Sequence, residues 1–306
     1  MQRLTRPTIL RVASTPAVER FFRQNGTTRG LVDRFVAGET LETALERVRP
    51  IAAEGMTVTL DLLGENVSTE AAARAAVGGY VVTLRRMAAA DLEPNISVKL
   101  TMLGLDLGDA LADAALREIL GVARGVGGFV RVDMEGSAYT ARTLALVEKL
   151  HDDFPNEVGT VIQSYLYRSA VDVETLIARR IQVRLVKGAY AEPASVAYQK
   201  TTEVDASYVR RMERLLDDGR YPALATHDPA LIRAAEGYAT RMGIGSERFE
   251  FQMLYGVRRD AQRDLVRRGR RVRVYVPYGT EWYPYFTRRI AERPANAVFV
   301  LRQLTG

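Results

Sequence analysis

Short runs of apolar and β-branched residues recur along the chain from position 56 onwards, separated by longer segments with helical spacing. Runs of this length and composition predict strands, and those that are apolar on both faces predict strands covered on both sides of a sheet. We predict strands at residues 57–62, 95–100, 129–133, 159–163, 182–187, 223–226, 249–253 and 272–276.

The segments between these runs predict helices, among them residues 69–87, 110–122, 140–150, 205–216 and 229–242. Strict alternation of strand and helix favours a parallel sheet, and eight such units in about 250 residues match a TIM barrel. A doubly wound open sheet is the competing fold. Its glycine-rich phosphate loops should follow strands, whereas the glycine clusters at 125–128 and 243–245 follow helices. We therefore predict an α/β fold of the (βα)8 type.

The chain before the first strand reads as helical. Thr40 is placed to cap a helix that runs through Leu41 and Val48 towards Gly55. We divide the chain into an N-terminal helical segment, residues 1–55, and a barrel, residues 56–306. The apolar side chains of the first segment, such as Phe22, are expected to pack on the barrel.

Composition narrows the chemistry. The 306 residues include no cysteine and only two histidines, His151 and His227, which do not form a spaced pair. Disulfides, thiol nucleophiles and iron–sulfur clusters are excluded, and we expect no metal site. Redox chemistry would then require an organic cofactor. With no membrane span and no secretory signal in the sequence, we expect a cytoplasmic protein.

Polar residues appear at or near the ends of most predicted strands, where a TIM barrel places its active site. The strands are expected to be apolar up to that point. Each polar residue has a structural interpretation too: Lys99 and Asp133 could form a buried ion pair, and Asp228 could cap a helix. Their number favours a shared pocket for an anionic cofactor and a small anionic substrate. These residues are Lys99, Asp133, Gln163, Lys187, Thr226, His227, Gln252 and Tyr275.

The last helix is predicted to start between Glu281 and Pro284 and to end before Pro294. Its consecutive Arg288 and Arg289 could converge on one carboxylate, because guanidinium groups bind carboxylates bidentately. Spacing alone favours a simpler interpretation, an amphipathic helix with an exposed ion pair between Arg288 and Glu292.

Several sequence motifs, in this order along the chain, resemble those of the proline dehydrogenase family. The resemblance extends from about residue 56 to residue 297 and is most specific in two of the motifs, residues 186–190 and 285–292. The chain length resembles the short, monofunctional bacterial members. The matching segments are residues 96–100, 131–135, 186–190, 225–227, 251–256, 275–279 and 285–292.

The resemblance implies a distorted (βα)8 barrel with the last helix over its mouth, non-covalent FAD, and oxidation of L-proline to 1-pyrroline-5-carboxylate. It also implies transfer of electrons to a membrane quinone, a peripheral position at the inner face of the cell membrane, and hand-over of the product to a pyrroline-5-carboxylate dehydrogenase. No nucleic-acid partner is implied.

Residue roles follow from the resemblance alone. Lys99, Arg288 and Arg289 would bind the substrate carboxylate, with Glu292 paired to Arg288. Asp133, Tyr190, Leu254, Tyr275 and Tyr285 would shape the pocket for the proline ring. Catalysis would rest on Asp133, Arg184 and Tyr275. The expected FAD contacts are Met134, Gln163, Arg184, Val186, Lys187, Gly188, Ala189, Thr226, His227 and Gln252.

Two other functions stay open at this point. Lys187 could be the Schiff-base nucleophile of a barrel lyase. The net charge of +6 and the arginine-rich segment 258–271 could indicate nucleic-acid binding, or equally a solvated helix face.

Overall fold

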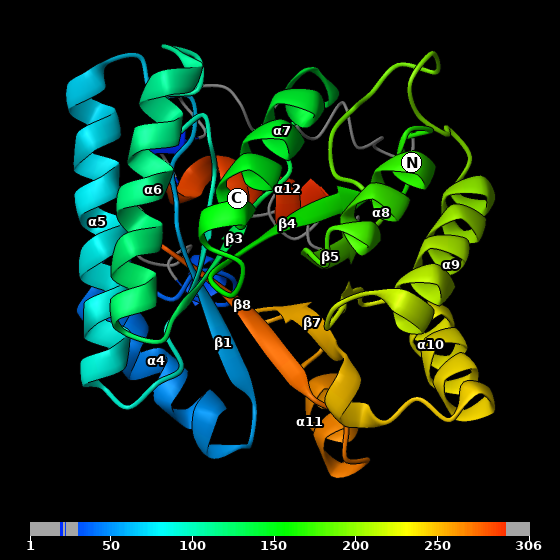
Figure 1. Ribbon diagram of the computed structural model, residues 1–306. Coiled ribbons are helices and arrows are strands. Elements are labelled where there is room, and N and C mark those ends of the chain that lie inside the picture. Colours follow the sequence, from blue (N-terminus) through cyan, green and yellow to red (C-terminus); the bar gives the residue numbers. More distant parts are fainter. Residues whose placement is uncertain (1–18, 21, 23–29, 292–306) are drawn as a thin grey trace, which may run out of the picture.

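The computed structural model describes residues 19–20, 22 and 30–291. Eight parallel strands pair in sequence order and close into a barrel, because β8 pairs with β1 over six residues from Thr57↔Arg273 to Leu62↔Tyr278. The predicted barrel is confirmed, and each predicted strand is present within two or three residues of its predicted bounds (Figure 1). The strands are β1 Thr57–Leu62, β2 Asn95–Val98, β3 Phe129–Val132, β4 Val158–Gln163, β5 Gln182–Val186, β6 Ala223–Ala225, β7 Glu250–Leu254 and β8 Val272–Tyr278.

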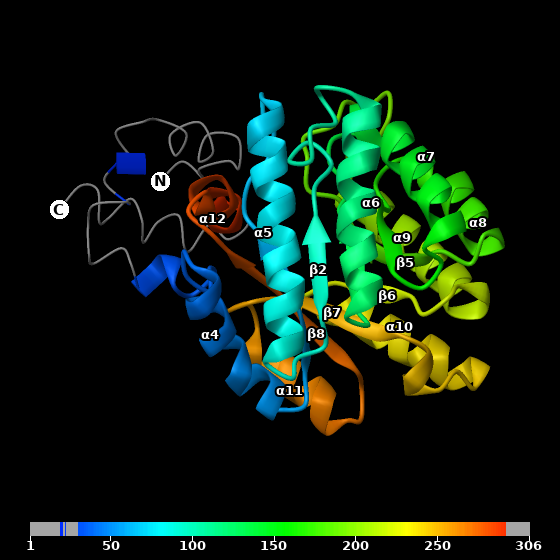
Figure 2. The same cartoon turned by 60° about the vertical axis from the view of Figure 1, so that its left-hand side comes forward.

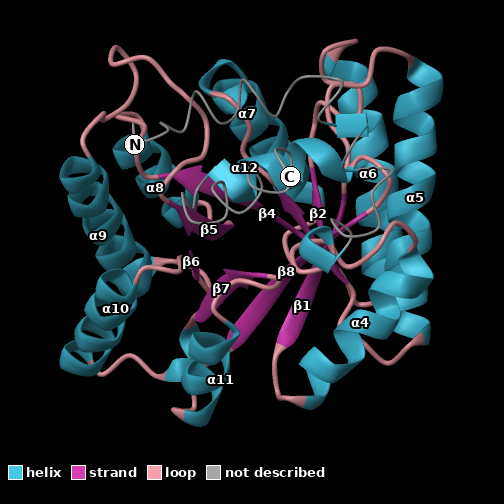
Figure 3. Cartoon of the chain, turned by 180° about the vertical axis from the view of Figure 1, so that it is seen from behind, coloured by secondary structure: helices cyan, strands magenta, loops and turns pink. Residues whose placement is uncertain are grey.

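Helices surround the barrel, as the view from behind shows (Figure 3). The predicted helices are confirmed, and Asp228 caps α10 by accepting a hydrogen bond from the Ala230 amide at 2.9 Å. The helices are α4 Leu41–Ala53, α5 Glu70–Ala89, α6 Asp109–Gly125, α7 Ser137–Asp153, α8 Ser169–Ala178, α9 Thr201–Asp218, α10 Pro229–Met242, α11 Arg259–Arg267 and α12 Trp282–Ala291, with a 3₁₀ turn at Ser246–Arg248.

The arginine-rich segment forms α11 and the turn that follows it. Arg263 pairs with Glu54 at 2.7 Å, and Arg270 pairs with Glu236 at 3.0 Å. These ion pairs agree with the interpretation of this segment as a solvated helix face, since Glu54 at the end of α4 and Glu236 on α10 match the charges of Arg263 and Arg270.

Helix α4 lies outside the barrel against β1 and β8. Its N-cap is Thr40, whose side chain accepts from the Thr43 amide, and its inner face buries Leu41, Leu45 and Val48. A helix that follows β8 would fill this place in a regular (βα)8 barrel. Here α12 follows β8 and lies instead at the upper end of the strands, at their C-terminal ends (Figure 2). The barrel is thus distorted in that α4, from before β1, covers the wall in place of the helix that follows β8.

A separate apolar cluster seats α12. Phe286 is fully buried, and its ring lies 5.3 Å from that of Phe22. Trp282 packs on Phe286 and donates from its indole N–H to Glu39 at 3.0 Å. The expectation that the N-terminal segment packs on the barrel is therefore confirmed for Phe22. The residues before position 19 lie outside the described part of the chain.

The barrel interior is charged, which the sequence did not lead us to expect. Arg131, Arg184, Glu250 and Arg273 are all buried within strands. The expectation of apolar strands up to their last residues is therefore wrong. The physical reason is pairing across the barrel: Arg273 Nε donates to Glu250 at 2.9 Å. Burial by itself raises the pKa of Glu250, but the charge of Arg273 and the hydrogen bonds from Arg273 and Gln252 together outweigh burial and hold that pKa below its usual range.

Among the described residues, none of the helices combines the length and the apolar character needed to cross a lipid bilayer.

The interior ion pair generates a stability prediction. Arg273→Met leaves the Glu250 carboxylate buried without its cation, which should lower the free energy of unfolding by about 3–5 kcal/mol. The double variant with Glu250→Met should recover at least half of that loss, because it removes the uncompensated charge. Urea denaturation measures both, with Arg241→Ala, an exposed arginine on α10, as the control. Additive losses in the double variant would contradict the pairing.

Candidate active site

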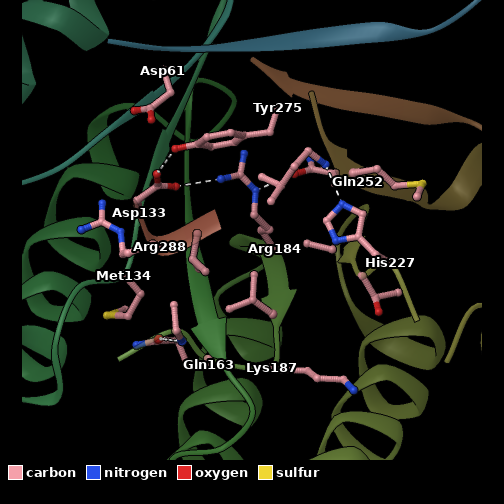
Figure 4. A pocket seen from close by; sticks show the side chains of 18 of the residues that line it. Asp61, Asp133, Met134, Gln163, Arg184, Lys187, His227, Gln252, Tyr275 and Arg288 are labelled. Atoms are coloured by element: carbon pink, nitrogen blue, oxygen red, sulfur yellow. Dashed lines mark hydrogen bonds and ion pairs between the residues drawn. The ribbon is translucent and has the colours of Figure 1, made fainter. Parts of the chain in front are cut away.

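A cavity of about 460 Å³ opens at the C-terminal ends of the strands, beneath α12 (Figure 4). Every predicted site residue that the structure describes lines it. These residues are Lys99, Asp133, Met134, Gln163, Arg184, Val186, Lys187, Gly188, Ala189, Tyr190, Thr226, His227, Gln252, Leu254, Tyr275, Tyr285, Arg288 and Arg289. The remaining predicted residue, Glu292, lies outside the described residues, so its role stays a prediction.

The centre of the site is the carboxylate of Asp133. It accepts hydrogen bonds from Arg184 Nη1 at 2.7 Å and from the Tyr275 hydroxyl at 2.8 Å. The Arg184 guanidinium also donates from Nε to Gln252 at 2.5 Å and lies 5.1 Å from the centre of the Tyr275 ring. Gln252 lies at the centre of β7 and Tyr275 at the centre of β8, farther from the strand ends than the sequence predicts.

Lys99 has a closer partner than the one predicted. Its Nζ is 3.0 Å from Asp61 Oδ1 and 3.8 Å from Asp133 Oδ2. Asp61 is fully buried, and its Oδ2 accepts no hydrogen bond from the described residues. Burial lowers the pKa of Lys99, but the two carboxylates more than offset this effect and raise that pKa, so Lys99 stays a cation.

Asp61 is not among the residues predicted from the sequence, although a signal was present. It is the polar residue next to the end of β1, and the rule that selected Lys99 and Asp133 applies to it equally. Burial raises the pKa of Asp61, while Lys99 opposes the shift. The electrostatic result is that two carboxylates, Asp61 and Asp133, fix one ammonium group at the barrel mouth.

The wall of the cavity is positioned by buried amide and imidazole groups. Gln163 donates to the Glu135 carbonyl at 2.9 Å and accepts from the Ala189 amide at 3.3 Å. Nε2 of His227 accepts from the Leu254 amide at 2.9 Å, so this imidazole carries its proton on Nδ1 if neutral. Gly188 has φ +128°, and a Cβ there would overlap the Tyr165 ring, which is why a side chain is absent.

Lys187 lies at the edge of the cavity between two carboxylates. Its Nζ is 2.5 Å from Asp205 and 3.0 Å from Asp228. Burial lowers its pKa, but the two carboxylates outweigh burial and raise it. A Schiff-base lysine needs a neutral amine, so this arrangement opposes the lyase interpretation.

Helix α12 brings Tyr285, Arg288 and Arg289 over the cavity. Arg288 Nη1 donates to Glu65 Oε1 at 3.2 Å, and Glu65 lies in the loop after β1. Glu65 is a second residue that sequence reasoning missed, since nothing in its local pattern links it to a helix more than 200 residues away. Arg289 lies over the Tyr285 ring at 5.2 Å.

Tyr190 also borders the cavity, on the loop after β5. Burial, with the nearby Glu135 charge, raises the pKa of Tyr190 to about 12, and burial also raises that of Tyr275. Both hydroxyls therefore stay protonated at neutral pH. The cavity thus combines cations after β2, on β5 and on α12 with neutral aromatic donors and an apolar wall that includes Val186.

Comparisons with known proteins agree with this geometry. A family model described as Proline dehydrogenase matches residues 44–302. The chain is 42% identical to Proline dehydrogenase of Deinococcus radiodurans, over 99% of this chain and 98% of that protein. It is 40% identical to Proline dehydrogenase 1 of Bacillus subtilis strain 168, over 98% of each.

Solved structures give the same result. The proline utilization A (PutA) protein from Bdellovibrio bacteriovorus, inactivated by N-propargylglycine, superposes with a TM-score of 0.84 at 26% identity. The match covers 95% of this chain but only 36% of that one. Fold, cavity and relatives of similar length agree, and the chain belongs to the proline dehydrogenase family of oxidoreductases.

Proposed function

We propose that this protein oxidises L-proline to 1-pyrroline-5-carboxylate, with FAD as the hydride acceptor and a quinone as the final acceptor. The observation that carries the proposal is the convergence of Lys99, Arg288 and Arg289 on one cavity whose walls are largely apolar. A small zwitterion with a carboxylate at one end and a hydrocarbon ring at the other matches these two surfaces.

The cavity residues suit a flavin. The cavity has a volume of about 460 Å³, which lies within the range, roughly 300–1,000 Å³, of small-molecule and cofactor sites. Val161, Val186 and Met253 offer an apolar surface to a flat ring system. Arg184 Nη2 is buried and donates to no acceptor among the described residues, which leaves an N–H group for a carbonyl or ring nitrogen of a ligand.

FAD, when bound, would accept a hydride from C5 of proline. Residues proposed to hold it are those on the β4, β5 and β6 side of the cavity, together with Met134 and Gln252. They are Met134, Gln163, Arg184, Val186, Lys187, Gly188, Ala189, Thr226, His227 and Gln252.

The chain's own residues would orient the substrate. Arg288 and Arg289 on α12 and Lys99 after β2 would bind its carboxylate from different directions, which fixes the ring with C5 facing the flavin side. Such orientation can contribute several kcal/mol to lowering a barrier. Tyr190, Leu254, Tyr275 and Tyr285 would enclose the ring and exclude water.

Hydride loss requires a neutral amine. Asp133 already accepts from Arg184 and Tyr275, so its charge is largely compensated. The cations around the carboxylate then favour the unprotonated amine. Asp133 would therefore position Arg184 and Tyr275 rather than serve as an obligatory base.

The electron acceptor and the fate of the product extend the same proposal. A quinone dissolved in a membrane would require peripheral attachment at the inner face of the cell membrane. Several relatives carry the name bifunctional protein PutA; the chain spans 24% of the Escherichia coli protein at 28% identity. This chain would hand its product to a pyrroline-5-carboxylate dehydrogenase.

The first prediction concerns the cofactor and substrate together. The purified protein should show flavin absorbance, and anaerobic proline should bleach it. N-propargylglycine, which carries a secondary amine and a carboxylate, should inactivate the enzyme in a time-dependent manner that excess proline slows. A colourless protein that FAD cannot reconstitute would refute the proposed chemistry.

The second prediction concerns the carboxylate clamp. Arg289→Ala should raise the KM for proline at least tenfold, because losing one charge-assisted contact costs about 1.5–3 kcal/mol. Steady-state kinetics with Arg263→Ala, an exposed arginine on α11, provide the matched control. A KM within about twofold of wild type for both Arg288→Ala and Arg289→Ala would reject the clamp.

The third prediction concerns pH. Since the raised pKa values keep Tyr190 and Tyr275 protonated at neutral pH, kcat/KM should rise with pH as the proline amine loses its proton. Tyr275→Phe should lower kcat/KM yet leave the midpoint of this rise in place. A midpoint displaced by more than about one pH unit in that variant would show that the tyrosine itself titrates.

A further inference from the structure

A second cavity, of about 390 Å³, lies at the opposite end of the barrel, where the strands begin. Thr57, Asn95, Gln182 and Val272, which line it, include the first residues of β1, β2, β5 and β8. In Figure 2 this is the lower end of the barrel, since β2 points upward towards α12. None of the site residues discussed above lines this cavity.

The charges that line this cavity do not balance. Arg273 occupies both carboxylates, at 2.9 Å from Glu93 and 2.9 Å from Glu250. Arg131 and Arg271 also line the cavity, and neither forms an ion pair with a carboxylate of the described residues. Glu250 attracts both charges from a longer distance, and Arg271 Nη1 donates to the Tyr221 hydroxyl at 3.4 Å. With three arginines and two carboxylates, this mouth carries an excess of one positive charge.

Arg131 is the more unusual of the two. It is only 3% exposed, and its Nε donates to no acceptor within the described chain. Burial, together with the positive charges of Arg184 and Arg273, lowers its pKa to about 9. Because a guanidinium stays protonated at neutral pH, this shift measures how poorly its charge is compensated.

The fold holds this guanidinium in one place. Nη1 of Arg131 donates to the Gln182 carbonyl at 2.7 Å, and the group lies 4.7 Å from the Phe129 ring centre. Gly159 provides the space, because a Cβ there would lie 2.6 Å from Arg131 Nη1. A fixed, desolvated cation beside an open cavity is preorganised to form charge-assisted hydrogen bonds with an anion.

We propose that the N-terminal mouth of the barrel binds a small oxyanion, a carboxylate or a phosphate, between Arg131 and Arg271. Arg271 is exposed at the rim, where its guanidinium lies 5.8 Å from the Tyr221 ring centre, and it would close on the ligand from solvent. The buried Arg131 would supply the charge from within. Such a ligand would stabilise the folded protein, because it compensates a buried charge that the chain leaves uncompensated.

The test uses the flavin-loaded enzyme and inorganic phosphate. At constant ionic strength, phosphate should raise the thermal unfolding midpoint in a saturable manner relative to chloride. Arg271→Ala should raise the phosphate concentration that gives a half-maximal shift roughly tenfold, as expected for the loss of one charge-assisted contact. Arg131→Gln should abolish it; if that variant folds poorly, Arg271→Ala decides the question.

Two control variants separate this site from other sources of the effect. Arg241→Ala removes another exposed arginine, which lies 5.4 Å from the ring of Tyr238, and should leave the phosphate dependence unchanged. Arg289→Ala removes a cation of the catalytic mouth and should also leave it unchanged. The proposal fails if phosphate gives no saturable shift, or if the shift survives in Arg271→Ala and is lost in Arg289→Ala.

Location can be tested directly. Crystals of the flavin-loaded enzyme soaked in selenate should show an anomalous peak between Arg131 and Arg271. Citrate competition against selenate then distinguishes a site that accepts carboxylates from one that prefers tetrahedral anions. Selenate found only at the catalytic mouth would overturn the proposal.

Discussion

The rest of the structure depends on the hydrogen bonds that the buried guanidinium of Arg184 donates. It lies within β5 and donates to Asp133 on one side and to Gln252 on the other. Gln252 in turn donates to Glu250, which accepts from Arg273 near the base of the barrel. A buried charge is tolerated only when it is paired and hydrogen-bonded, so each residue of this column requires the next.

This column explains why the catalytic mouth is preorganised. Asp133 is fixed by two donors before any substrate arrives, and Lys99 is fixed by Asp61 and Asp133. These groups lie on or directly after strands of a closed barrel, which are rigid elements. The two arginines of α12 belong to a helix seated by a separate apolar cluster, so the site combines a fixed half and a half that depends on the packing around Phe286.

Much of this architecture could be predicted from the sequence, because strands covered on both faces produce short β-branched runs and the intervening helices have their own period. Strand closure could not be predicted locally: Thr57 pairs with Arg273 across more than 200 residues. For the same reason the Arg288–Glu65 contact was missed.

The charged interior was missed for a different reason. Arg131, Arg184 and Arg273 look like the polar positions of half-exposed strands, and only the closed barrel shows that they face one another. Asp61 could have been found by the strand-end rule, whereas the roles of Arg288 and Arg289 came from family resemblance rather than from spacing.

The placement of α4 against β1 and β8 also bears on which parts of the sequence can be altered without disturbing the barrel. Because α4 covers β1 and β8 from outside, the barrel wall is complete without α12. Helix α12, which carries Arg288 and Arg289, is therefore not part of the barrel wall, and its own buried side chains, Trp282 and Phe286, hold it in place. Redesign of substrate preference in this fold has a natural starting point there, at the end of the chain rather than in its core.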